Sequence, residues 1–306
     1  MSAIVSYEFE LLWTKFYRPS PEILQSIANE IEAFHPRVPI QETYSDIVFS
    51  VDEDKKYIHV KIEIDENELF DDIDSEEFGW ENILDDTVVS RLKDVLFVMN
   101  LAYPGCIHVY KSVVFRDGRQ LPIRFAYSSD ISSWVYEDCK WLVFESLSIQ
   151  QCWDWITSKT SFLSYISRTP IDRALFALSY ESVANENTYI FYVLLGIEAI
   201  YNNGSNKEDS IMEQLRRKVQ ALLGQLPRKA IRSLNEMYSM RSKLVHGSAN
   251  IFKCWPSEDY DECEYEKLCE ERQFTVTATG ILLATIQKFI KANANTLSET
   301  VTVELK

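Results

Sequence analysis

The sequence predicts an α+β domain followed by an all-α helical bundle, and two observations lead to this fold class. Before about residue 160, segments with the alternating hydrophobicity of half-buried strands are mixed with helical segments, without a regular βαβ order. After that point the strand pattern disappears, and amphipathic helical segments follow one another with short links. We therefore predict an α+β N-terminal domain over residues 1–160 and a helical bundle domain over residues 161–306.

The first domain begins with a predicted helix over residues 20–34, because Ser20 is a favourable N-cap and Pro21 fits the first helical position. Residues 57–64 alternate strictly between apolar and polar side chains, which predicts a half-buried strand. A second helix is expected over residues 85–103, with an aspartate as its cap. Further strands are expected over residues 46–51, 106–115, 121–129 and 141–149.

The second domain contains five segments with helical periodicity. Pro227 falls at the start of one segment, and Gly224 and Gly247 fall at the ends of two, as helix boundaries favour. The last segment could be interrupted around Thr275–Gly280. The expected helices span residues 169–186, 187–204 (with Asn203-Gly204 as its stop), 209–224, 227–247 and 264–294.

The composition indicates a folded protein of the cell interior. Hydrophobic residues make up 46% of the chain, which is enough for two buried cores. The first residues have no basic and apolar signal pattern, and no apolar run is long enough to cross a membrane, so a cytoplasmic location without a membrane partner is expected. Six scattered cysteines without a C-x-x-C pair indicate reduced thiols, and they predict neither a metal site nor a cofactor.

The charge is distributed unevenly along the chain, whose formal net charge is −16. Residues 51–100 hold 16 acidic and 5 basic residues, a balance of −11, and include the acidic run 65–86, which we interpret as an exposed loop. Residues 211–250 hold 8 basic and 2 acidic residues, a balance of +6. This basic segment is either a pair of solvated helix faces or a local anion-binding surface. The candidate RNA-binding residues in it are Arg216, Arg217, Lys218, Arg228, Lys229, Arg232 and Lys243.

The stretch Arg241–Asn250, "RSKLVHGSAN", lies at the end of the fourth predicted helix. A structural role explains it: basic residues complement the negative end of a helix dipole, and glycine often follows the last turn. A catalytic role is the alternative. Cleavage of RNA by its own 2′-hydroxyl needs a histidine to move protons and an arginine to stabilise the phosphorane, and no metal. Arg241 and His246 are the candidates for these two roles.

The spacing of this pair matters for the catalytic role. Five residues of an α-helix turn through about 500°, so the Arg241 and His246 side chains project about 140° apart. A lone chain is therefore a poor site, and a two-fold interface between two fourth helices would bring a second pair to the same cleft. This geometry predicts a homodimer.

The segment resembles the HEPN superfamily, in particular its Apea-like branch, over about residues 165–295. The family pattern is R-x(4–6)-H with a polar residue after the arginine, here Arg241, Ser242 and His246. The resemblance extends to an apolar helix that carries Glu198 and to Tyr238 ahead of the arginine. It implies a metal-independent endoribonuclease that acts as a homodimer on tRNA or other RNA, often as a toxin or antiphage defence effector. Ser242 would contact or orient the phosphate, and Glu198 and Tyr238 would support the site.

Two other functions stay open. Some HEPN domains are not nucleases, so the chain could be an interaction or sensor module that dimerises or binds a regulatory partner, or a nucleotide-binding domain. The acidic overall charge favours such a module. Residues 1–160 would regulate or target a nuclease, or would act as a sensor that binds a ligand or a phage protein in a non-catalytic module. The remaining histidines, His35, His59 and His108, are given structural roles, because no sequence arrangement suggests a triad.

Overall fold

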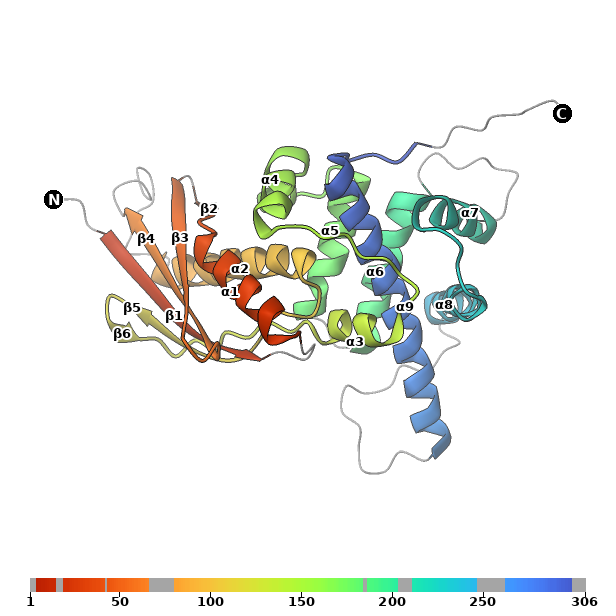
Figure 1. The fold of residues 1–306 in the computed structure, drawn as a ribbon, viewed down its shortest axis with the longest axis horizontal. Helices are drawn as coiled ribbons and strands as arrows, with labels where there is room; N and C mark the ends of the chain where they lie inside the picture. The colour runs from red at the N-terminus through yellow and green to blue at the C-terminus, as the bar shows by residue number, and fades with distance from the viewer. Residues whose placement is uncertain are drawn as a thin grey trace. The chain divides into compact units, whose positions relative to one another are not determined.

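The computed structural model describes residues 4–14, 19–41, 43–65, 80–183, 186–202, 211–246 and 262–298 (Figure 1). The chain divides into two compact units. Unit 1 consists of Met1–Ser133 and Leu147–Asp154, and unit 2 consists of Trp134–Ser146 and Trp155–Lys306. The boundary predicted near residue 160 falls shortly after the last change of unit. Within the described residues, no helix is long and apolar enough to span a membrane.

Unit 1 is built on a six-stranded antiparallel sheet with the order β2-β3-β4-β1-β5-β6. The sequence predicts an α+β fold for this part of the chain, and the sheet and its helices agree with it. The strands are β1 (Ile4–Thr14), β2 (Arg37–Ile40), β3 (Thr43–Val51), β4 (Tyr57–Asp65), β5 (His108–Arg116) and β6 (Arg119–Gln120).

The alternation predicted for β4 is confirmed. Ile58, Val60, Ile62 and Ile64 are buried, whereas the residues between them are exposed. β1 has the same pattern, with Val5, Tyr7, Phe9, Leu11 and Trp13 buried, and it pairs with both β4 and β5 at the centre of the sheet. Sequence reasoning missed this strand. The signal was present in its period of two.

Two helices of unit 1 pack against the sheet: α1 (Pro21–Ala33) contacts β3, and α2 (Trp80–Ala102) contacts β2. The Ser20 hydroxyl accepts a hydrogen bond from the Ile23 amide, which confirms the predicted cap. α2 was predicted to begin at an aspartate cap near residue 85, and this is wrong. The helix starts at Trp80, and Asp85 lies inside it, where its carboxylate accepts hydrogen bonds from the Tyr7 hydroxyl at 2.6 Å and Arg116 at 3.1 Å.

The acidic run 65–86 is therefore not a loop throughout, because residues 80–86 belong to α2. Residues 66–79 lie outside the described part of the chain.

Two predicted strands, over residues 121–129 and 141–149, are not present. In the first segment only Tyr127 forms a β-bridge, with Val109. The Phe125 amide there bonds the Ser112 hydroxyl, and in the second segment the Glu145 amide bonds the side chain of Gln287 at 2.9 Å. Side chains thus satisfy backbone groups that a strand would have paired. Two short helices that the sequence did not suggest, α3 (Asp130–Asp138) and α4 (Ile149–Lys159), flank the second segment.

The described residues of unit 2 are mostly helical, and the helical periodicity predicted for this part of the chain is confirmed. The described helices are α5 (Pro170–Ser179), α6 (Glu186–Tyr201), α7 (Ile211–Leu223), α8 (Arg228–Val245) and α9 (Glu262–Ala292), with 3₁₀ turns η2 (Phe162–Ser164) and η3 (Tyr180–Ser182). Thr169 and Asp172 form a capping box at the start of α5. The predicted stripe of α6 is buried: Ile190, Val193, Leu194, Ile197 and Ile200. The predicted stop at Asn203-Gly204 lies outside the described residues.

α9 is the central helix of unit 2 and contacts α5, α6, α7 and α8. No interruption occurs at Thr275–Gly280, where we considered one. Thr275, Thr277 and Thr279 are buried, and the hydroxyls of Thr277 and Thr279 donate to carbonyls four residues earlier. Residues 275–287 of α9 are all buried, so the threonines there have no solvent-exposed face, and these bonds to the helix backbone satisfy their hydroxyls.

Candidate functional site

The candidate catalytic residues lie at the carboxyl end of α8. The helix starts directly after Pro227, whose carbonyl accepts from the Ile231 amide at 3.1 Å. Ala230, Leu234 and Met237 form a buried stripe at helical spacing, and α8 packs on α9. The packed face thus fixes the helix in unit 2 and leaves its polar residues on other faces.

The last turn of α8 places Ser242, Lys243 and His246 in exposed positions. Arg241 belongs to the helix, but its side chain is outside the described part, as is Gly247, the predicted terminator. The His246 amide donates to the Ser242 carbonyl at 3.0 Å. The backbone therefore still follows the α-helical pattern at His246, and the ideal offset of about 140° between residues 241 and 246 applies.

The two supporting candidates lie on different helices. Tyr238 precedes Arg241 by three residues on α8, so both residues lie on neighbouring positions of one helical face. Its side chain is half-buried and its hydroxyl oxygen is buried. Glu198 is half-buried in the last turn of α6, where its carbonyl accepts from the Asn202 amide.

The seven candidate RNA-binding cations lie on α7 and α8. Three make contacts inside unit 2: Lys218 donates to the carbonyl of Tyr201 at 2.7 Å, Arg232 pairs with Glu236 at 2.7 Å, and Lys229 reaches Gln273 at 3.4 Å. Lys218 thereby caps the carboxyl end of α6. Five of the seven side chains are exposed and two, Arg216 and Lys218, are half-buried; the exposed ones are Arg217, Arg228, Lys229, Arg232 and Lys243.

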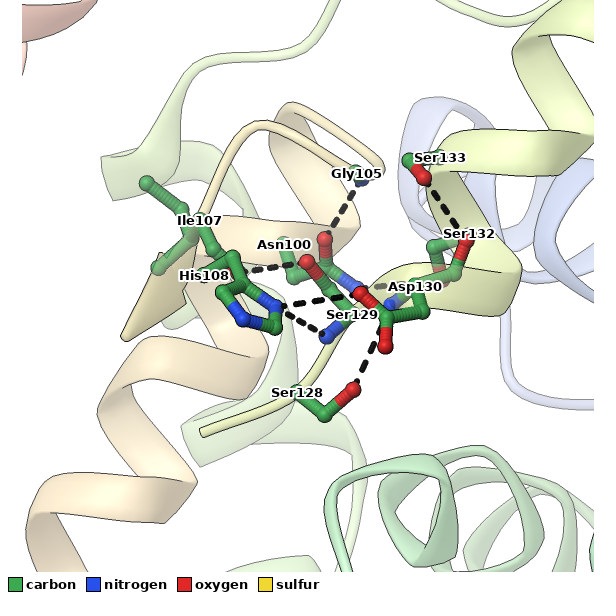
Figure 2. A network of polar contacts seen from close by, with 9 residues as sticks. All are labelled: Asn100, Gly105, Ile107, His108, Ser128, Ser129, Asp130, Ser132 and Ser133. Atoms are coloured by element: carbon green, nitrogen blue, oxygen red, sulfur yellow. Dashed lines mark hydrogen bonds and ion pairs between the residues drawn. The ribbon is translucent and has the colours of Figure 1, made fainter. Parts of the chain in front are cut away.

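A second polar cluster, around His108 in unit 1, was not anticipated (Figure 2). His108 begins β5 and is buried, as are Ser129 and Asn100. The Ser129 amide donates to Nδ1 of His108 at 3.3 Å, and a carboxylate oxygen of Asp130 lies 3.4 Å from the same nitrogen. The side-chain oxygen of Asn100 accepts from the Gly105 amide at 2.7 Å. The cluster thus ties the end of α2 and the start of α3 to the sheet.

Two serine hydroxyls of this cluster donate to backbone carbonyls. The Ser129 hydroxyl donates to the Ile107 carbonyl at 2.6 Å, and the Ser133 hydroxyl donates to the Asp130 carbonyl at 2.7 Å. Each of these two hydroxyls donates to a backbone carbonyl and not to the imidazole of His108, as a nucleophile paired with a base would. Burial lowers the pKa of His108, and the nearby Asp130 carboxylate opposes this.

The described residues contain no group of three metal-ligating side chains. Cys106, Cys139 and Cys152 are buried, and burial raises the pKa of each thiol to about 12. Such thiols stay protonated at neutral pH and are poor nucleophiles. Cys254 and the Cys263 side chain lie outside the described part.

Comparisons with models of known protein families, with curated proteins and with solved structures found no match.

Proposed function

We propose that the protein is a metal-independent endoribonuclease of the HEPN type, with Arg241 and His246 as its catalytic pair. One observation carries the proposal: the motif occupies the exposed carboxyl end of α8 in a helical unit, and Ser242, Lys243 and His246 are accessible there. An exposed imidazole can meet a substrate, whereas the buried His108 cannot.

The proposed reaction is attack of an RNA 2′-hydroxyl on the adjacent phosphate. His246 removes the 2′-OH proton, the new O–P bond forms, and the bond from phosphorus to the 5′-oxygen breaks as that oxygen takes up a proton. Arg241 donates hydrogen bonds to the phosphorane oxygens, and Ser242 contacts the phosphate. The products carry a 2′,3′-cyclic phosphate and a 5′-hydroxyl.

The reaction removes a proton from the 2′-hydroxyl and delivers a proton to the 5′-oxygen. One motif supplies a single histidine for these two proton transfers. The offset of about 140° also keeps Arg241 and His246 from sharing a narrow face. Both points favour a homodimer in which two α8 ends form one cleft and the partner's motif completes the site. Arg217, Arg228 and Lys243 have exposed side chains and are proposed to bind RNA phosphates. As a cellular role we propose a toxin or antiphage defence effector that acts on tRNA or other RNA.

The test is cleavage of total RNA or tRNA by the purified protein in EDTA, with the ends analysed for 2′,3′-cyclic phosphate. R241A and H246A should each abolish cleavage. H59A is the matched control, because His59 is also an exposed histidine but lies on β4. Cleavage that persists in R241A and H246A would overturn the proposal.

A second candidate function is a non-catalytic module that binds a regulatory protein or a nucleotide. Two observations favour it: the net charge is −16, and Lys218 and Arg232 are engaged within unit 2. Bacterial expression separates the two functions. Toxicity that disappears with H246A supports the nuclease, and harmless expression with binding of a partner supports the module.

A further inference from the structure

Strands β3 and β4 of unit 1 separate at one end. Their paired residues run from Val51–Ile58 to Ile47–Ile62 and stop there. Beyond that point Thr43–Asp46 of β3 continue to pair with β2, and Glu63–Asp65 of β4 continue to pair with β1. Figure 1 shows the two strands diverging. We call the gap between residues 43–46 and 63–65 the fork.

The fork contains an open cavity of about 380 Å³. Its lining includes alternate residues of each strand: Tyr44, Asp46 and Val48 of β3, and Lys61, Glu63 and Asp65 of β4. Cavities that bind small molecules or side chains have volumes of roughly 300–1,000 Å³. The fork is therefore large enough for two or three residues of an extended peptide.

The backbone of β3 is directed into the fork at Tyr44. Adjacent residues of a strand direct their backbone N–H and C=O groups to opposite neighbours. The Ile47 amide donates away from β4, to the Pro36 carbonyl at 3.0 Å, so residues 44, 46 and 48 are directed toward β4. The paired register of β3 and β4 ends before Tyr44, so among the described residues of β4 none is paired with Tyr44. Such an edge is a template for another strand.

The charges of the fork select a cation. The lining has three carboxylates (Asp46, Glu63 and Asp65) and one amine (Lys61). Asp46 pairs with Arg37 at 3.2 Å and Glu63 with Lys61 at 2.6 Å, but all four side chains are at least half exposed. Exposed ion pairs are worth little, so an incoming cation can replace their partners at small cost. The carboxylates would repel nucleic acid.

We propose that the fork binds an extended peptide segment that carries an arginine or lysine. Its backbone pairs with β3 at Tyr44, and its cationic side chain binds Asp46 and Glu63. The side-chain stem covers Val48 and Tyr44, which are 46% and 61% exposed. The binding mode is strand addition with side-chain selection. It does not depend on the proposed nuclease activity.

The experiment uses the full-length ¹⁵N-labelled protein and short probes, because the natural peptide is not identified. The probes are acetyl-Val-Arg-Val-amide, the same peptide with glutamate in place of arginine, and the arginine peptide with N-methylated backbone amides. Amide signals of residues 43–46 and 63–65 are followed up to millimolar peptide. The arginine peptide should bind saturably, and the other two should bind about tenfold more weakly or not at all.

The double variant D46N/E63Q tests the site, and E10Q is its matched control. Glu10 is an exposed carboxylate of the same sheet that does not line the cavity. D46N/E63Q should weaken binding about tenfold, whereas E10Q should leave it unchanged. The proposal is overturned by equal binding of the glutamate or N-methylated peptide, by equal loss in E10Q, or by unshifted signals with the arginine peptide.

Discussion

The polar cluster around His108 and the motif around His246 place the same side chain in opposite environments. His108 is 6% exposed and lies between a backbone amide and a carboxylate of its own unit. His246 is exposed at the end of a helix. A buried histidine with internal partners contributes to folding, whereas an exposed one next to Ser242 and Lys243 is available to a ligand. This comparison leads to four predictions.

The largest expected effect is the loss of RNA cleavage when His246 is replaced, which replacement of His108 should not cause. H246A should reduce RNA cleavage about 10²- to 10⁴-fold, because it removes the proposed proton-transfer group, and it should leave the unfolding transition unchanged. H108A should do the reverse: it should lower stability and leave cleavage by the remaining folded protein intact. Cleavage rates and urea unfolding, measured on both variants, check this. Loss of activity in H108A at full folding would contradict the comparison.

The second prediction concerns the loop beside the His108 cluster. Gly105 has φ +76°, and a Cβ there would lie 2.7 Å from the backbone nitrogen of Ser133. Gly118 has nearly the same φ, +75°, but a Cβ there meets nothing within 4 Å. G118A should therefore cost about 1 kcal/mol of unfolding free energy from backbone strain alone. G105A should cost about 3 kcal/mol or more, because the added methyl group also displaces packed backbone.

Urea unfolding of both glycine variants isolates the steric contribution. A similar cost for G105A and G118A would mean that the start of α3 moves freely away from residue 105.

The third prediction concerns a cation that the sequence assigned to RNA. Lys218 donates to the Tyr201 carbonyl at the end of α6, so K218M should cost about 1 kcal/mol of stability. R217M changes an exposed neighbour on the same helix and should leave stability nearly unchanged. R217M should lower the RNA affinity more than K218M does, because Arg217 is exposed whereas Lys218 is half-buried. Thermal unfolding and filter binding distinguish the roles, and equal effects of both variants on both measurements would refute the assignment.

The hydrophobic pattern of the sequence predicted those strands and helices that bury one face and expose the other. This is why β4, α1 and the stripe of α6 are confirmed. Residues 121–129 also alternate, but the Ser112 hydroxyl donates to the Phe125 carbonyl and accepts from the Phe125 amide, and the sequence does not show such a distant partner. Thr275, Thr277 and Thr279 of α9 are buried together with the apolar residues around them. The sequence therefore shows polar residues at buried positions, and we interpreted them as a possible interruption of the helix.

In the candidate site too, some features could be predicted from the sequence and others could not. The position of the motif at a helix end could be predicted from residues 241–247 themselves. The bond from Lys218 to Tyr201 joins two helices, and only the fold reveals it. The pairing of Arg232 with Glu236, four residues apart, could have been predicted from helix geometry.

The smallest expected effect is the pH dependence of stability that His108 contributes. Burial lowers the pKa of His108 in the folded protein below its value of 6.5 in the unfolded chain. The unfolded state therefore binds the proton more readily, and stability is retained above pH 6.5 and lost as the pH falls toward the folded pKa. The slope from one such group cannot exceed about 1.4 kcal/mol per pH unit.

H108N tests this pH dependence, because the asparagine oxygen can occupy the position of Nδ1 and accept from the Ser129 amide without titrating. The difference in unfolding free energy between wild type and H108N should be constant above pH 7. It should shift in favour of H108N between pH 6.5 and 5. D130N should strengthen the loss in the wild-type background, because it removes the carboxylate that supports the protonated imidazole. If D130N instead reduces the loss on acidification, Asp130 does not interact with the imidazolium, and His108 is buried for packing alone.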